Sequence, residues 1–271
     1  MQVDFKNKVV VVTGAASGIG RATAERFCQL GAHVYALDVK QDSLDSVVDA
    51  MLEAGYQADR IVADVGNPGE WYPQLASVPR IDVLCNVAAI IDPSELKIDE
   101  AMNMIASGGL RGLKKLETEL QDVVATNYRG PYLLSLFAAQ KMRGSASPAR
   151  PDDADGKKER RGVIINVGST NVFTQNERRL VYAPLKAALH MLTELMAKGL
   201  AKYGIRVNCV APGATAGTGM VGDEQDAQRK MPLGINTVDD VVDAIVYLAS
   251  DYARNVTGEV LKIDGGRTVS R

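Results

Sequence analysis

The chain has 271 residues, of which 46% are hydrophobic and 24% charged, and its formal net charge is −2. This composition is ordinary for a globular protein that buries a large core. The small negative charge argues against a nucleic-acid or anionic-membrane partner, because both require a basic surface. No apolar stretch reaches the roughly 18 residues that a membrane helix needs, and the first residues lack the apolar core of a signal peptide. We therefore expect a cytoplasmic protein with no membrane partner. Its three separated cysteines are expected to be reduced and buried.

Short apolar runs alternate along the chain with longer amphipathic segments. The runs predict strands at residues 9–12, 33–37, 61–63, 83–85, 163–165, 207–210 and 260–263. Strands that are apolar throughout are buried on both faces, which is typical of a parallel sheet covered by helices. The alternation predicts an α/β protein with a Rossmann-type, doubly wound, seven-stranded parallel sheet and helices on both faces. We expect a single domain over residues 1–271.

Two stretches interrupt this alternation. Residues 143–161 contain no large apolar side chain, and Pro148, Pro151 and Gly156 disfavour a helix, so we predict a flexible, exposed loop. Residues 94–121 carry leucines at helical spacing after Gly108-Gly109, which predicts a helical insertion packed on the outside of the domain.

A glycine-rich turn, Thr13-Gly14-Ala15-Ala16-Ser17-Gly18-Ile19-Gly20, lies between the first strand and the first helix. Glycines there let the backbone approach a pyrophosphate, and the helix N-terminus offers free N–H groups and partial positive charge. A tight strand-to-helix turn is the alternative interpretation, but the strand before it and the helix after it favour dinucleotide binding. The predicted contacts are Gly14, Ser17, Gly18, Ile19 and Gly20.

Asp38 ends the second predicted strand, at the distance from the glycine turn that suits a ribose contact. A carboxylate there accepts hydrogen bonds from a ribose diol and repels a 2′-phosphate, so the sequence predicts NAD as cofactor, with NADP disfavoured. Lys40 and Arg21 are the cations that would oppose this preference if either reached the phosphate.

Tyr182 and Lys186 lie four residues apart in Tyr182-Ala183-Pro184-Leu185-Lys186, so both project from one face of a predicted helix. A free phenol titrates near 10 and is a poor base at neutral pH, whereas a neighbouring ammonium favours the phenolate. The pair therefore predicts a proton shuttle. Ser169 follows the strand at 163–167, where its hydroxyl would polarise a substrate oxygen.

Together these motifs resemble the short-chain dehydrogenase/reductase family, from about Lys6 to Gly266. The resemblance implies an enzyme that moves a hydride between a nicotinamide ring and the carbon of a secondary alcohol or ketone. It implies Tyr182 as the general acid/base, Ser169 as the group that holds the substrate oxygen, and Lys186 as the group that binds the nicotinamide ribose and lowers the Tyr182 pKa. The helical asparagine of the family's proton relay is similar to Asn127, which would link Lys186 to solvent.

Further cofactor contacts are implied by the same resemblance. The implied positions are Asp64, Val65, Asn86, Ala88, Pro212, Gly213 and either Thr215 or Thr218, besides Tyr182 and Lys186. The family's Asn-Asn-Ala-Gly is replaced here by Asn86-Val87-Ala88-Ala89, so the sheet loses the support of the second asparagine. His33 and His190 have no partner at metal-ligand spacing, and no metal site is predicted.

The substrate is not named by the sequence. The residues expected to line its pocket, Val172, Phe173, Met220, Val221, Met231 and Leu233, are apolar and favour an alcohol or ketone with a hydrophobic body. The neighbouring Arg178-Arg179 pair leaves open an anionic substrate instead.

Two further expectations concern class and assembly. A dinucleotide-sensing binding protein without turnover is the alternative to an enzyme, because fold alone does not prove function. An epimerase or dehydratase is disfavoured by the short chain after Gly213. Apolar residues on more than one face of 133–142 and 187–200 predict pairing of these helices across two-fold axes, giving a homodimer or homotetramer.

Overall fold

The computed structural model describes residues 3–144, 160–174, 176–220 and 230–269. All seven predicted strands are present and form one parallel sheet in the order β3-β2-β1-β4-β5-β6-β7. The strands are β1 (Val9–Thr13), β2 (His33–Asp38), β3 (Gln57–Val62), β4 (Val83–Asn86), β5 (Gly162–Val167), β6 (Ile205–Pro212) and β7 (Val260–Ile263). Because β1 and β4 are neighbours in the sheet, the strand order reverses between them, and the predicted doubly wound fold is confirmed.

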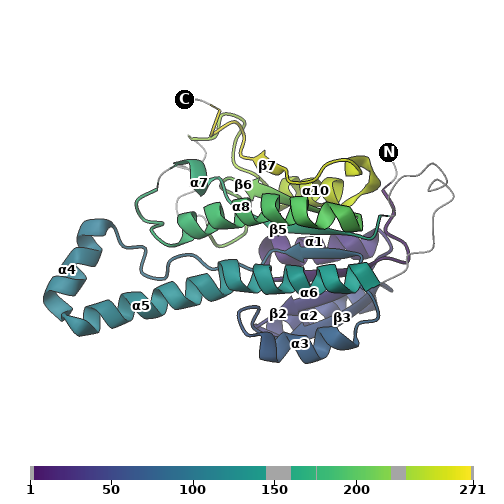
Figure 1. Ribbon diagram of the computed structural model, residues 1–271, viewed down its shortest axis with the longest axis horizontal. Helices are drawn as coiled ribbons and strands as arrows, with labels where there is room; N and C mark the ends of the chain where they lie inside the picture. The colour runs from purple at the N-terminus through teal and green to yellow at the C-terminus, as the bar shows by residue number, and fades with distance from the viewer. Residues whose placement is uncertain (1–2, 145–159, 175, 221–229, 270–271) are drawn as a thin grey trace.

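Helices cover both faces of the sheet (Figure 1). One layer packs through α1 (Gly18–Gln29), α2 (Gln41–Glu53) and α10 (Val238–Ala249). The other layer packs through α3 (Pro68–Ser77), α6 (Gly130–Gly144) and α8 (Tyr182–Leu200). Short helical segments complete the fold at α7 (Asn171–Thr174), η3 (Ala201–Tyr203) and η4 (Asp251–Ala253).

The apolar strands feed two separate cores. Val10 and Val12 of β1 pack with the layer that contains α1, whereas Val11 between them packs with the opposite layer. All three side chains are fully buried, which explains why the strand shows no alternation of apolar and polar residues.

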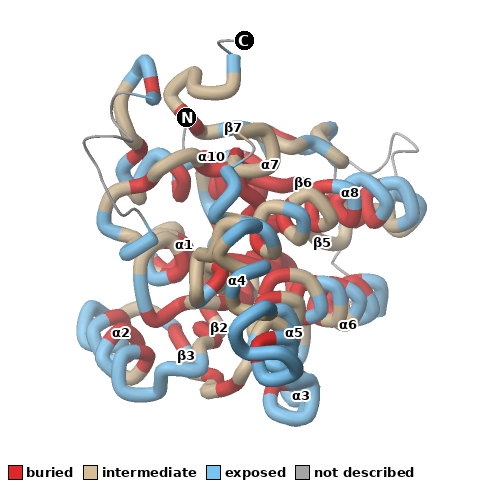
Figure 2. The backbone as a smooth tube through the Cα atoms, turned by 90° about the vertical axis from the view of Figure 1, so that its left-hand side faces the viewer, coloured by how far each residue is buried: buried red, intermediate tan, exposed pale blue. Residues whose placement is uncertain are grey.

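The predicted helical insertion is an arm of two helices, α4 (Ile98–Gly108) and α5 (Leu110–Val124). Gly109, with a φ of 52°, ends the first helix and begins the second. The arm projects away from the sheet, and Figure 2 shows that its surface is mostly exposed. α5 continues through the π-helical turn η1 (Ala125–Arg129) into α6 without a break in helical backbone.

The loop predicted at 143–161 falls mainly on residues 145–159, which lie outside the described part of the chain. Among the helices that are described, none is long and apolar enough to cross a membrane.

A buried polar network joins the two strands beside the switch in strand order. The Asn86 amide donates to Ser135 Oγ (3.0 Å) and to Asn166 Oδ1 (2.9 Å). Asn166 in turn donates to Thr193 Oγ1 (2.9 Å), so β4, α6, β5 and α8 are connected.

Replacing Asn166 with leucine is expected to destabilise the fold by about 1–3 kcal/mol, because its buried partners lose their hydrogen bonds. Urea unfolding followed by circular dichroism measures this loss. The same substitution at the exposed Asn103 is the control and should change stability by less than about 0.5 kcal/mol. Equal stability of the two variants would show that the network contributes nothing.

Candidate active site

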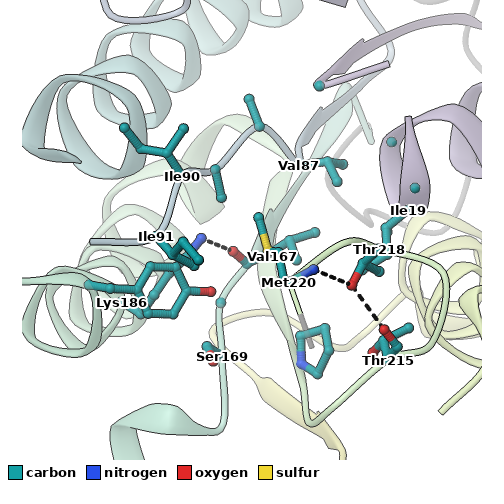
Figure 3. A pocket seen from close by; sticks show the side chains of 18 of the residues that line it. Ile19, Val87, Ile90, Ile91, Val167, Ser169, Lys186, Thr215, Thr218 and Met220 are labelled. Carbon is teal, nitrogen blue, oxygen red and sulfur yellow. Dashed lines mark hydrogen bonds between the residues drawn. The ribbon is translucent and has the colours of Figure 1, made fainter. Parts of the chain in front are cut away.

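A cavity of about 480 Å³ lies at the carboxyl ends of the strands. It begins at the glycine turn after β1 and reaches the start of α8, where Tyr182 lies. Its volume is within the range of small-molecule and cofactor sites. Figure 3 shows Ile19, Thr215 and Thr218 on one side and Ser169, Lys186 and Ile91 on the other.

The glycine turn brings the backbone close to the neighbouring strand. Gly14 has a φ of 69°, and a Cβ there would come within 2.9 Å of the backbone of Ala88. A Cβ on Gly20 would lie 2.0 Å from the Gly14 carbonyl oxygen, so α1 can start at this place only with glycine. The first turn of α1 contains no acidic residue, and Ser17 makes no capping hydrogen bond. The positive end of the helix is therefore available to an anion such as pyrophosphate.

Two carboxylates line the cavity beyond this turn. Asp38 accepts hydrogen bonds from Ala16 N (3.0 Å) and Lys40 N (2.9 Å), one on each oxygen. Each oxygen keeps a lone pair for a second donor such as a ribose hydroxyl. Asp64 accepts from Gly66 N (2.8 Å), and Val65 beside it lines the same wall. These contacts fit the adenosine end of a dinucleotide.

At the other end of the cavity, β5 and α8 bring three side chains together. Ser169 follows β5, and Tyr182 and Lys186 lie one turn apart at the start of α8. Lys186 Nζ donates to the Val167 carbonyl (2.7 Å; Figure 3) and lies 5.5 Å from the centre of the Tyr182 ring. All three are buried but border the cavity, so a substrate oxygen can reach them.

The pKa of Tyr182 is raised, whereas the sequence predicted that Lys186 would lower it. Burial raises the pKa of Tyr182, a hydrogen bond with Ser169 and the charge of Arg179 lower it, and Asp92 raises it. The expectation that Lys186 lowers this pKa is therefore not met in this structure. The net shift is upward because desolvation of the phenolate dominates, and the cation that opposes it is Arg179.

Burial also lowers the pKa values of two bases near Tyr182. Burial lowers the pKa of Lys186 to about 8. Burial and the charge of Lys186 lower the pKa of His190 to about 4, so this imidazole is neutral at pH 7. His190 Nε2 accepts from Ser169 N (3.4 Å), and His33 pairs with Asp59 (2.6 Å). Both histidines are thus hydrogen-bonded to groups of the protein itself.

Asn127 lies in the π-helical turn, but its side chain does not border the cavity. Its amide bonds to Ile90 in both directions: Oδ1 accepts from Ile90 N (2.9 Å), and Nδ2 donates to Ile90 O (2.6 Å). The side chain of Asn127 is thus bonded to Ile90 and makes no hydrogen bond with Lys186 among the described residues. Asn127 instead fixes the segment after β4 whose Ile90 and Ile91 line the cavity.

Other predicted residues are also placed by the structure. Asn86, the last residue of β4, is buried within the polar network and is not among the residues that line the cavity, so its contact with a cofactor stays a prediction. Thr215 and Thr218 both line the cavity, and Thr218 donates to Thr215 O (2.9 Å), so neither is singled out. The remaining predicted contacts that line the cavity are Gly14, Ser17, Gly18, Ile19, Gly20, Asp38, Asp64, Val65, Ala88, Pro212 and Gly213.

The apolar lining expected for the substrate is mostly wrong. Of the described candidates only Met220 borders the cavity. Phe173 packs against His190, Met231 is buried under Gly213, and Leu233 is 89% exposed. Val172 is likewise absent from the lining, and Val221 lies outside the described residues. The apolar wall is supplied by Ile90 and Ile91, which were not predicted from the sequence.

Asp92 is a second residue that the sequence reading missed. It is buried, and its two oxygens accept from Val181 N (2.9 Å) and Tyr182 N (2.7 Å). A carboxylate at this place satisfies free N–H groups and favours the positive end of α8. The segment between β4 and the helical insertion thereby positions the backbone of the predicted catalytic tyrosine.

The described residues contain no group of three side chains that would hold a metal ion. Cys28, Cys85 and Cys209 are free and buried, as predicted. Burial raises the pKa of Cys28 and of Cys209 to about 12, so neither is a thiolate near neutral pH.

Comparison with known proteins identifies the family. The short chain dehydrogenase family model matches residues 8–229, and the chain belongs to this family. It is similar to an uncharacterized oxidoreductase of Thermotoga maritima, with 30% identity over 98% of this chain and 99% of the relative. The NAD-dependent glycerol dehydrogenase of Listeria innocua is also 30% identical, over 98% of this chain and 96% of that protein. Among solved structures, 7α-hydroxysteroid dehydrogenase in complex with NADH and 7-oxo glycochenodeoxycholic acid is 25% identical, with a TM-score of 0.78 over 98% and 96% of the two chains. The protein is therefore an oxidoreductase of the short-chain dehydrogenase family.

The lowered pKa of Lys186 predicts a distinct dependence of stability on pH. The folded pKa is about 8 against an ordinary value of 10.5, so between these values the unfolded chain binds more protons. Stability conferred through this group is therefore lowest below pH 8 and rises up to about pH 10.5. Relative to the Lys186→Met variant, the wild type should gain on the order of 3 kcal/mol across this range. Urea unfolding of both proteins at pH 7 and pH 10 measures the gain, and a constant difference would contradict the burial argument.

Proposed function

We propose that this oxidoreductase is an NAD-dependent enzyme that interconverts a secondary alcohol and a ketone, with Tyr182 as general acid/base. The observation that supports this most strongly is the convergence of Ser169, Tyr182 and Lys186 on the cavity that starts at the glycine turn. The residues of that turn also fit a dinucleotide, because they combine a close backbone approach with a helix end that lacks a neighbouring acid. The nicotinamide, when bound, supplies the hydride or accepts it.

The protein side of the reaction is orientation and proton transfer. In the direction of reduction, the Tyr182 hydroxyl donates its proton to the carbonyl oxygen, and the Ser169 hydroxyl holds that oxygen in place. The raised pKa of Tyr182 keeps the proton on the phenol until the oxygen gains charge. Lys186 would bind the ribose beside the nicotinamide. A solvent link through Asn127 would use its main chain, since its side chain is bonded to Ile90.

Tyr182→Phe is expected to lower kcat by about a hundred- to ten-thousand-fold, because it removes the proton donor while preserving the ring. Turnover of a panel of secondary alcohols with NAD is followed by the absorbance of the reduced nicotinamide. Tyr252→Phe, at an exposed tyrosine, is the matched control and should keep wild-type activity. More than a tenth of wild-type turnover in Tyr182→Phe would rule out this role. A wild-type protein that binds NAD but turns over nothing would favour the sensor alternative.

The preference for NAD follows from Asp38. A 2′-phosphate at the ribose would lie against this carboxylate, and each 1.4 kcal/mol of repulsion is tenfold in affinity. Lys40 also lines the cavity and is a cation that could oppose this preference, whereas Val39 between Asp38 and Lys40 is exposed and apolar. The Listeria relative is named for NAD dependence, and the solved 7α-hydroxysteroid dehydrogenase holds NADH, which agrees with this choice.

We expect kcat/KM to be at least about a hundredfold higher with NAD than with NADP. The double variant Asp38→Ser/Val39→Arg should narrow or reverse this ratio, because it exchanges the repelling acid for a cation. Both cofactors are compared at saturating alcohol, with Asp38→Ser alone as the intermediate case. Equal efficiency with NADP in the wild type would mean that Lys40 or Arg21 neutralises the phosphate.

The proposed assembly is a homodimer or homotetramer. The helix layer formed by α6 and α8 carries exposed apolar side chains, namely Leu136 on α6 and Met191 and Leu195 on α8. Two copies that pair these helices would remove such side chains from water, which is the favourable contribution that closed symmetric assemblies use.

A further inference from the structure

A buried cation lies at the end of the cavity where Tyr182 is found. Arg179 lines this end together with Asn176, and only 12% of its side chain is exposed. Ala183 N donates to Arg179 O (3.1 Å), which holds the backbone of Arg179 against the start of α8. Arg179 and Tyr182 both border the cavity. The proposed mechanism uses no cation at this position.

The only acid that neutralises Arg179 in the described structure comes from the insertion after β4. Arg179 Nη1 lies 2.6 Å from Glu95 Oε1, yet this fully buried nitrogen has no aligned hydrogen-bond acceptor. The Glu95 side chain is 41% exposed, and its backbone has a φ of 47°, a conformation that residues other than glycine rarely adopt. The buried guanidinium thus has an incompletely satisfied donor, and its counter-ion can move into solvent.

The neighbouring arginine behaves differently. Arg178 is exposed and donates to the Glu95 carbonyl (3.1 Å), and it does not line the cavity. The two described acids that line the cavity, Asp38 and Asp64, follow β2 and β3 at the opposite end. Of the described carboxylates near Tyr182, Asp92 is bonded to Val181 N and Tyr182 N, whereas Glu95 is the one that pairs with Arg179 and would compete with a substrate for it.

The surroundings of Arg179 are mixed in polarity. Ile90 and Ile91 form an apolar wall from the insertion side, and Met220 borders the cavity from the segment after β6 (Figure 3). A ligand that satisfies both parts has one anionic group and an apolar body. Glu95 already places a carboxylate against the guanidinium, and a single cation balances a carboxylate but not a phosphate dianion.

We propose that Arg179 binds a carboxylate of the substrate in place of Glu95, so that the substrates are hydroxy acids and the corresponding oxo acids. The inference rests on the proposed function, because it assumes that an alcohol carbon reacts at Tyr182. The positive charge of Arg179, which also favours the ionised form of Tyr182, is then balanced by the substrate carboxylate in place of Glu95.

The test compares acids with their neutral amides. The probes are 2-, 3- and 4-hydroxypentanoate and the three matching hydroxypentanamides, oxidised with NAD. For at least one pair, kcat/KM of the acid should exceed that of the amide by about tenfold or more, and Arg179→Met should bring this ratio close to one. Arg178→Met is the matched control and should preserve the ratio. Glu95→Gln should raise kcat/KM for the acid, because it removes the competing carboxylate.

Binding is measured separately from turnover. Pentanoate should raise the Tm of the wild type, pentanamide should not, and the effect of pentanoate should vanish in Arg179→Met, whose own Tm shows whether it folds. Three outcomes would contradict the carboxylate site but leave the proposed dehydrogenase activity intact. The wild type could turn over amides as well as acids, or Arg179→Met could keep the acid-to-amide ratio of kcat/KM. The third outcome is a Glu95→Gln variant whose kcat/KM for the acid equals that of the wild type. Preference for phosphorylated polyols would also overturn the carboxylate site. If no alcohol is oxidised but pentanoate still binds through Arg179, the proposed function fails and the anion site stands.

Discussion

The structure depends on the close approach of β1 and β4 at the point where the strand order reverses. Thr13 Oγ1 accepts hydrogen bonds from Val87 N and Ala88 N (both 3.0 Å) and so joins the ends of the two strands. Gly14 has no side chain that would hold Ala88 away. The helices that follow these strands leave on opposite faces, so the loops diverge and the cavity opens between them.

The electrostatics of the site follow from burial. Tyr182 and Lys186 are both removed from water, which raises the pKa of the phenol and lowers the pKa of the amine. The two shifts favour the uncharged forms of both groups, at a cost in stability. Such a cost is common where activity requires ionisable groups in a closed cavity. Groups placed around them, including Ser169, Arg179 and Asp92, then adjust how readily the proton moves.

Local patterns explain why the fold and much of the site could be predicted. The fully apolar strands, the glycine turn and the Tyr182–Lys186 spacing each express their geometry within a few residues. The edge strand β3 was predicted too short, because its first residues, beginning at Gln57, alternate between polar and apolar side chains. The partner of Asn127 lies 37 residues away, and that of Tyr182 N lies 90 residues away. Only Arg179 of the Arg178-Arg179 pair borders the cavity. This choice depends on the tertiary placement of the insertion, so it cannot be predicted from the spacing of nearby residues.

The unbroken helix through α5, η1 and α6 connects the projecting arm to the core of the domain. α6 packs against the core, whereas α5 extends outward, so the π-helical turn η1 lies where the helix leaves the body of the domain. Asn127, within that turn, is bonded to Ile90 on both sides, and Asp92, two residues further on, is bonded to the start of α8. Two short sets of hydrogen bonds therefore link the base of the projecting arm to the wall of the cavity and to the backbone of Tyr182.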